Sequence, residues 1–163
     1  MPYINWEEFL VRHAIVVAVL FLVAACAKPA TTLSSGTRSG TTGNVVGAGS
    51  SRAAVESFMS AVKAADLQAM STIWGNEKGP GRNQFKRDEL EKRLIVMQCL
   101  LQHDRWSFLD NTPQLQTGGR QLWPVTLTRK RATAKTTLTT VRGPAGRWFL
   151  VDADLTPLRD FCA

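Results

Sequence analysis

The sequence predicts an α+β fold, in which N-terminal helices pack on a curved, cone-like antiparallel sheet of about four strands. Apolar residues recur at helical spacing between residues 52 and 101, and at the two-residue spacing of strands between residues 105 and 154. A stretch rich in Ser, Thr and Gly separates this region from an apolar N-terminal run. We therefore expect a signal peptide over residues 1–25, a flexible linker over 26–51 and a single domain over 52–163.

The apolar run over residues 14–26, AIVVAVLFLVAAC, is too short for a membrane-spanning helix, which needs roughly 20 residues. Preceded by Arg12, it is typical of the apolar part of a secretory signal. Residues 23–26, VAAC, resemble the lipobox of bacterial lipoproteins. The resemblance implies that the Cys26 thiol carries a diacylglyceryl group, that the chain is cut before Cys26, and that the new amino terminus is acylated. An ordinary cleaved signal peptide and an uncleaved anchor helix are the alternatives.

A lipid anchor at Cys26 implies a location in the cell envelope, because two or three buried acyl chains hold a protein stably on a membrane. Residues 27–28 lack the aspartate that resembles an inner-membrane retention signal, which favours the outer membrane, facing the periplasm, if the cell has two membranes. Glu7 and Glu8 make the start of the signal acidic, whereas the start of a secretory signal is usually basic. Translation that begins at Val11 would leave both residues out, so Val11 is an alternative to Met1 as the start.

The charge and the cysteines fit the same compartment. The formal net charge is +7, and the chain from Cys26 onward carries 19 basic and 11 acidic side chains. In the envelope this favours contact with anionic headgroups or polymers and not with nucleic acid, with a solvated basic face as the alternative. Once Cys26 is lipidated, Cys99 and Cys162 remain as an even pair, which predicts a disulfide outside the cytoplasm. Two buried free thiols are the alternative.

Three helices are predicted from their apolar stripes and capping residues. The first begins at Ser50 or Ser51, and its stripe consists of Val55, Phe58, Met59 and Val62. Asp66 is placed to begin the second helix and Gly75 to end it. The third begins at Asp88, with Glu91 as the partner of a capping box. Residues 75–87, dense in Gly and Pro, are predicted to form a loop.

Four strands are predicted after the helices, where Thr, Val, Leu, Trp and Phe alternate. They cover residues 105–110, 121–130, 132–142 and 147–154. The last two are joined by a hairpin turn over residues 143–146, GPAG. Pro124 is expected at a sheet edge or a bulge, because proline cannot donate to a strand ladder.

These elements resemble the nuclear-transport-factor-2-like superfamily, which includes ketosteroid isomerase. The likeness covers about residues 52–156 and depends on residues 53–74, AAVESFMSAVKAADLQAMSTIW, and 147–155, RWFLVDADL. A cystatin-like helix on a sheet is the nearest alternative. Enzymes of the resembled fold use an acid/base Asp or His with Tyr donors, but the one tyrosine here is Tyr3, in the predicted signal. We therefore expect no catalytic residue, no metal and no cofactor.

The candidate site residues fall into three groups. A ligand pocket would be lined by Trp74, Trp106, Trp123, Trp148, Asp152 and Asp154, although the two aspartates are expected on the outer face of the closing strand. A basic turn consists of Arg129, Lys130 and Arg131, which could hold an anion or simply be solvated. His103, beside Asp104, is expected to be a partly positive imidazole at a helix C-terminus and not a catalytic base.

The sequence thus favours a membrane-tethered envelope lipoprotein whose domain binds a ligand or partner without catalysis. One alternative is a small-molecule carrier or weak enzyme that uses the concave face of the sheet. The other is a structural envelope component that contacts an anionic polymer. The expected partners are the membrane, through the lipid anchor, and an envelope protein or anionic polymer. A concave face filled by tryptophan and leucine would favour the binding or structural functions. An open concave face with buried carboxylates would favour the carrier or enzyme.

Overall fold

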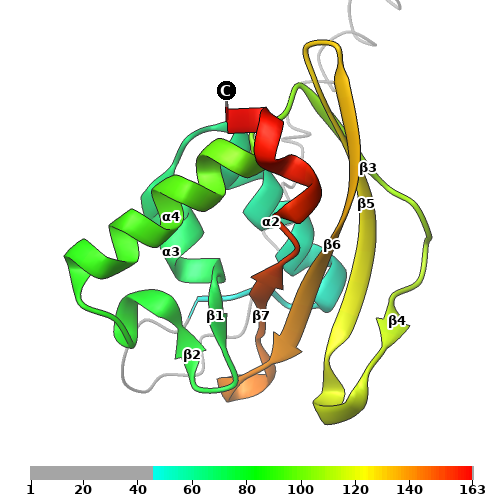
Figure 1. The fold of residues 1–163 in the computed structure, drawn as a ribbon. Helices are drawn as coiled ribbons and strands as arrows, with labels where there is room; N and C mark the ends of the chain where they lie inside the picture. Colours follow the sequence, from blue (N-terminus) through cyan, green and yellow to red (C-terminus); the bar gives the residue numbers. More distant parts are fainter. Residues whose placement is uncertain (1–45, 163) are drawn as a thin grey trace, which may run out of the picture. The chain divides into compact units, whose positions relative to one another are not determined.

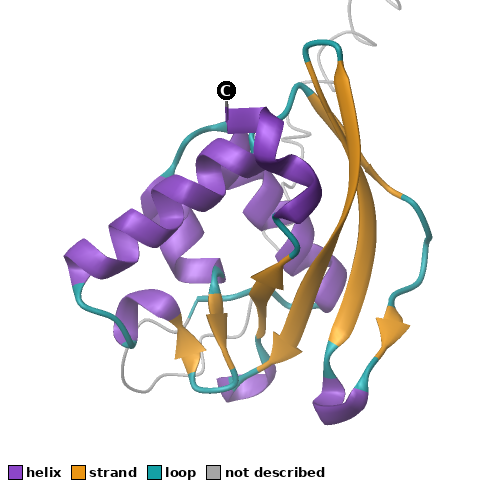
Figure 2. Cartoon of the chain, in the orientation of Figure 1, coloured by secondary structure: helices purple, strands orange, loops and turns teal. Residues whose placement is uncertain are grey.

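A layer of helices covers one face of an antiparallel sheet in the structure, a computed structural model that describes residues 46–162 (Figures 1 and 2). The described residues belong to one compact unit, Gly43–Ala163. This arrangement confirms the predicted α+β class. The predicted signal peptide, the Cys26 lipidation site and the linker as far as residue 45 lie outside the described residues.

The first two helices begin where the sequence predicts. Helix α2 spans Ser51–Lys63, and the Ser50 side chain accepts a hydrogen bond from the Ala53 N–H as its N-cap. Helix α3 spans Leu67–Ile73 and has Asp66 as its N-cap, which accepts from the Ala69 N–H. The two short polar residues at these positions satisfy backbone donors that the first helical turn leaves unpaired.

Helix α4 spans Arg87–Leu101 and begins differently from the prediction. Its N-cap is Lys86, which makes no side-chain capping bond, so the capping box expected at Asp88 is wrong. Asp88 lies in the first helical turn, where a carboxylate still interacts favourably with the helix dipole. Glu91 instead pairs with Arg87 at 2.9 Å.

The main sheet contains the four predicted strands and one more. Its strands are β3 (Arg105–Phe108), β4 (Gln114–Leu115), β5 (Gln121–Arg129), β6 (Ala132–Arg142) and β7 (Trp148–Ala153). The order is β3-β5-β6-β7, all pairs are antiparallel, and β4 pairs with β5. The described sheet therefore has five strands where four were expected, because two residues are too few to show an alternating pattern. The turn η3 (Pro144–Gly146) joins β6 to β7 as predicted.

Pro124 lies in an inner strand, not at the expected edge, and its pairing with Thr137 is in regular register. Its carbonyl faces β3 and accepts the N–H of Leu109 at 2.9 Å. The N and the C=O of a residue in an antiparallel strand point to the same side, so the nitrogen of Pro124 faces that side too. There β3 ends opposite Val125 and β4 begins opposite Leu122, so the missing N–H falls between two short neighbours.

The segment predicted as a loop over residues 75–87 contains regular structure. Strands β1 (Gly75–Asn76) and β2 (Gly79–Pro80) form an antiparallel ribbon, followed by the turn η1 (Gly81–Asn83). A Cβ atom on Gly75 would lie 2.2 Å from the Gly79 carbonyl oxygen, so the ribbon needs glycine at position 75. The glycines thus permit a close backbone approach, which a composition-based loop prediction overlooks.

The core lies between α2 and the inner face of the sheet. The predicted stripe of α2 is fully buried, and the sheet contributes Trp123, Val125, Leu127, Leu138 and Leu150. Polar groups inside this core are paired with one another. The Trp123 Nε1–H donates to Ser51 Oγ at 2.7 Å, and Ser51 Oγ lies 2.6 Å from Thr140 Oγ1. Thr140 Oγ1 in turn donates to the Gln121 carbonyl, so each buried hydroxyl has a partner.

The sequence places the start of the folded domain at residue 52, but residues before it are also bonded to the domain. The N–H and C=O of Ala48 both bond with Trp148 on β7, and Gly47 donates to the Thr72 carbonyl. The Arg147 guanidinium donates to the carbonyls of Val46 and Gly47. Residues 46–50 have the same composition as the predicted linker, but backbone bonds hold them on the domain.

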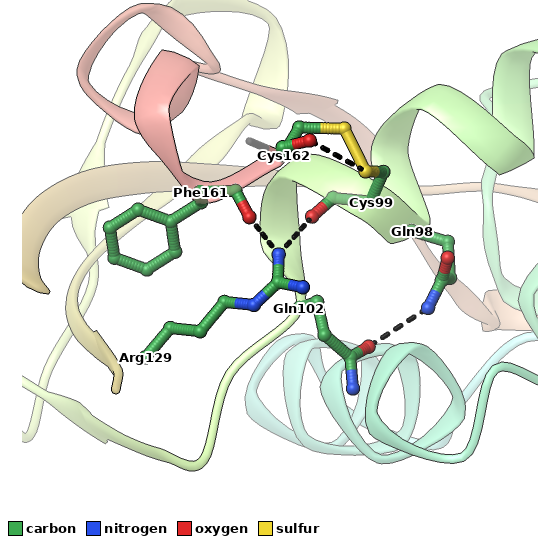
Figure 3. The surroundings of a disulfide bond; sticks show 6 residues. All are labelled: Gln98, Cys99, Gln102, Arg129, Phe161 and Cys162. Carbon is green, nitrogen blue, oxygen red and sulfur yellow. Dashed lines mark hydrogen bonds between the residues drawn. A yellow bond between two sulfur atoms is a disulfide. The ribbon is translucent and has the colours of Figure 1, made fainter. Parts of the chain in front are cut away.

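The predicted disulfide joins Cys99 on α4 to Cys162 at the end of η4 (Thr156–Cys162), with the Cα atoms 5.2 Å apart (Figure 3). Beside it, the Arg129 guanidinium donates to the carbonyls of Cys99 and Phe161. Both carbonyls lie in the last turn of a helix, where they lack partners within the helix and carry the negative end of the dipole. One cation therefore stabilises the ends of both helices that the disulfide connects.

Removing the disulfide should destabilise the domain substantially. The two cysteines are 63 residues apart, and closing such a loop in the unfolded chain corresponds to about 4 kcal/mol in the chain-entropy model. We expect Cys99→Ser/Cys162→Ser to lower the free energy of unfolding by up to about that amount in urea titrations. Dithiothreitol should destabilise the wild type and leave the double variant unaffected; equal stability of the wild type with and without reductant would contradict the prediction.

Ser51→Ala should cost about 1–3 kcal/mol of unfolding free energy, because it leaves the buried Trp123 indole N–H without an acceptor. The matched control is Ser57→Ala, which removes an exposed hydroxyl from the same helix. Thermal or urea unfolding of both variants checks the prediction. Similar losses in the two variants would mean that the buried hydroxyl contributes nothing specific.

Candidate functional site

The structure does not bring the six predicted pocket residues together. Trp123 is buried in the core, and its ring lies 5.0 Å from Phe108, which in turn contacts Trp106 at 4.8 Å. Trp74 lies elsewhere and stacks on Phe85, with ring centroids 5.4 Å apart. The inner face of the sheet is therefore occupied by side chains that pack on α2, and Trp74 makes a different aromatic contact from that of Trp106 and Trp123.

The remaining predicted pocket residues lie at the β7 end of the sheet. Trp148 is half-buried and begins β7, where it bonds with Ala48. Asp152 is exposed and lies opposite Thr139, on the face of the sheet away from the helices. Asp154 is also exposed and accepts a hydrogen bond from the Thr156 N–H at 3.0 Å. Solvent-facing carboxylates in these positions do not form a buried acid/base pair.

The basic turn separates into two parts with different environments. Arg129 is half-buried and directs its guanidinium to the ends of α4 and η4, as described above. Lys130 and Arg131 are exposed. The backbone N–H of Lys130 donates to Asp104 Oδ2 at 2.6 Å, which holds the turn against the start of β3. Two of the three cations are thus available to an anionic partner, and the third has a structural contact.

Among residues 46–162, His103 is the buried residue with an acid–base group, and 2 % of the residue is exposed. Its Nδ1 lies 2.9 Å from the Leu101 carbonyl oxygen, which can only accept, so Nδ1 carries the proton. Nε2 has no hydrogen-bond partner within residues 46–162. Burial lowers the pKa of His103 below its ordinary value of 6.5 and outweighs the hydrogen bond with the Leu101 carbonyl, which raises it; the positive charge of Lys63 lowers it further. The imidazole is therefore neutral, not the partly positive group that the helix terminus led us to expect.

Two hollows flank α4 on the outside of the helical layer. One, of about 390 Å³, lies between α3 and α4 and has an apolar floor that includes Leu67, Phe85 and Leu94. Its rim carries the Arg87–Glu91 ion pair. The other hollow, of about 410 Å³, is open and is lined almost wholly by apolar surface; its residues are Trp74, Lys92, Arg93, Val96, Met97 and Leu155.

The exposed surface of α4 next to the second hollow was not among the predicted sites. Ile95 and Val96 are 52 % and 53 % exposed, although both are large and apolar. A signal for it is present in the sequence: residues 94–97 are LIVM, and four consecutive apolar residues cannot all face inward from a helix with 3.6 residues per turn. Here Leu94 and Met97 face inward and the two between them face solvent.

Within residues 46–162, no group of three or more His, Cys, Asp or Glu side chains is arranged to hold a metal ion. Over the same range, no helix combines the length and the apolar character needed to cross a membrane. Comparison of the chain with protein-family models, with curated proteins and with solved structures found no match.

The stability of the domain should decrease as the pH falls below about 6.5 because of His103. Its pKa is lowered in the folded state, so the unfolded chain binds more protons once the pH falls below about 6.5. The stability that the neutral imidazole contributes is complete above that value and is lost as the pH falls towards the folded-state pKa. We expect urea unfolding of His103→Gln to show a flatter pH dependence than the wild type over this range. Parallel curves for the two proteins would contradict the assignment.

Proposed function

We propose that this protein is a lipid-anchored protein of the cell envelope whose α+β domain binds a partner through its outer surface and carries out no chemistry. The anchor is Cys26, within the VAAC motif that follows the apolar run over residues 14–26. The Cys99–Cys162 disulfide supports an oxidising compartment, because such bonds are rare in the cytosol. The basic charge of the chain supports partners that carry anionic groups.

The filled inner face of the sheet is the observation that carries the proposal. The inward side chains of β5 and β6, among them Val125, Leu127 and Leu138, are fully buried against α2. A carrier or enzyme of the resembled superfamily would need an open space in that position, lined mostly by apolar side chains with a few polar groups. Because the space is occupied by core side chains, binding through the periphery of the domain is the better-supported function.

The order of elements supports the proposed likeness to the nuclear-transport-factor-2-like superfamily. Among the described residues, three helices precede the strands of the main sheet, and α2 lies along the inner face of that sheet. In this proposal the fold serves as a scaffold for a binding surface, since a fold by itself does not determine function.

A contact with an anionic polymer is the second candidate function. Lys130 and Arg131 are exposed at the tip of the β5–β6 hairpin, which Figure 1 shows projecting beyond the helical layer. Their position would allow an extended anionic chain to reach both side chains.

Intact mass of the protein from the membrane fraction tests the anchor. We expect a chain that begins at Cys26 and carries acyl groups, and whose Cys99 and Cys162 are alkylated only after reduction under denaturing conditions. Cys26→Ala should abolish the acylation and release the product from the membrane. The matched control, Cys99→Ala/Cys162→Ala, should remain acylated. A full-length, unacylated wild-type chain would overturn the proposal.

A further inference from the structure

The outer surface of α4 combines apolar side chains and cations next to an open hollow. Among the described residues, Ile95, Val96, Leu109 and Leu115 are the exposed large apolar side chains. The first two are adjacent on α4, and Val96 also lines the 410 Å³ hollow with Trp74 and Leu155. We call Trp74, Lys92, Arg93, Ile95, Val96 and Leu155 the α4 face. Exposed apolar side chains beside an apolar hollow indicate a candidate interaction site.

The cations of the α4 face lie beside its apolar side chains. Lys92 is exposed and lines the hollow. The Arg93 guanidinium lies 5.1 Å from the centroid of the Phe85 ring and 2.8 Å from a Glu89 oxygen, which hold it at the rim. Long cationic side chains around apolar and indole groups are typical of surfaces that meet the headgroup region of a membrane.

The chain enters the domain close to the α4 face. Ala48 pairs with Trp148, and Trp74 pairs with Leu150. Trp148 and Leu150 make these contacts on the edge of β7 that does not face β6. These two positions are two residues apart along the strand, or roughly 7 Å. Residues before Val46 therefore join the domain at the same edge of the sheet that carries Trp74.

The predicted tether is long enough for the α4 face to reach the membrane. It is also short enough to keep the domain close to the membrane surface. The predicted linker from Cys26 to residue 45 has 20 residues, for which a Gly/Ser-like coil has an r.m.s. span of about 25 Å. A binding site on such a tether has an effective concentration on the order of millimolar at the surface to which it is attached. A contact that is weak in solution can thus be well populated on the tethered protein.

We propose that the α4 face docks on the surface of an anionic lipid bilayer, with Lys92 and Arg93 at the phosphate groups and Trp74, Ile95 and Val96 among the upper methylene groups. This inference rests on the proposed lipid anchor and adds an orientation: the helical layer faces the membrane and the outer face of the sheet faces away. A second copy of the chain is the less suitable occupant, because two-fold packing on this face would bring the Lys92 and Arg93 cations of both copies close together.

Quenching of tryptophan fluorescence by brominated lipids tests the docking. The processed protein, with its acylation established by intact mass, is reconstituted into vesicles of brominated phosphatidylglycerol and phosphatidylcholine, and into vesicles of brominated phosphatidylcholine alone. We expect quenching in the anionic vesicles, its loss in Trp74→Phe, and little quenching in the zwitterionic vesicles. Val96→Asp and Lys92→Glu should each abolish it, while far-UV circular dichroism stays unchanged.

The matched controls are Leu115→Asp and Lys135→Glu, which make the same changes at exposed positions outside the α4 face. Both should retain the wild-type quenching. An acylated wild-type protein without quenching in anionic vesicles would overturn the docking alone and favour a protein partner for this face. Equal losses in the control variants would also overturn it. A chain without acyl groups would overturn the proposed function and, with it, this inference.

Discussion

The packing of α2 on the inner face of the sheet is the constraint on which the rest of the domain depends. The four stripe residues of α2 are fully buried, and the inward side chains of β5 and β6 meet them from the other side. This contact fills the space between α2 and strands β5 and β6 with close-packed core side chains. The Ser51–Thr140 and Ser51–Trp123 hydrogen bonds add direction to an otherwise apolar contact, because they are satisfied only when the start of α2 lies over β5 and β6.

The C-terminal segment is held on this core by three different kinds of interaction. Leu158 and Phe161 bury their side chains, the disulfide joins Cys162 to α4, and Arg129 bonds to the carbonyls at both helix ends. Arg129 comes from β5, so the sheet, α4 and η4 meet at one point (Figure 3). Both hydrogen bonds come from Nη1 of this guanidinium, which donates one N–H to each carbonyl.

Where the sequence pattern is long and regular, it predicts the fold closely. The stripe of α2, the caps at Ser50 and Asp66 and the four longer strands are all found near their predicted positions. The predictions fail where contacts between elements, and not the local pattern, determine the structure. Strand β4 is too short to show alternation, and the ribbon around Gly75 depends on a close approach to a residue four positions later. From the sequence, Arg129 belongs to a basic turn that could be solvated. Its structural role depends on the end of η4, which the fold brings beside it.

The candidate site was harder to predict than the fold for a related reason. Aromatic residues and carboxylates suggest a pocket by type alone, but their positions depend on which face of the sheet is filled. On α4, the buried positions Leu90, Leu94, Met97 and Leu101 suffice to pack the helix, so Ile95 and Val96 are not needed for the core. Exposing two large apolar residues has an unfavourable hydration free energy with no packing benefit in return. That cost is recovered if the α4 face is covered in the working protein, and an anionic membrane beside the predicted tether would cover it.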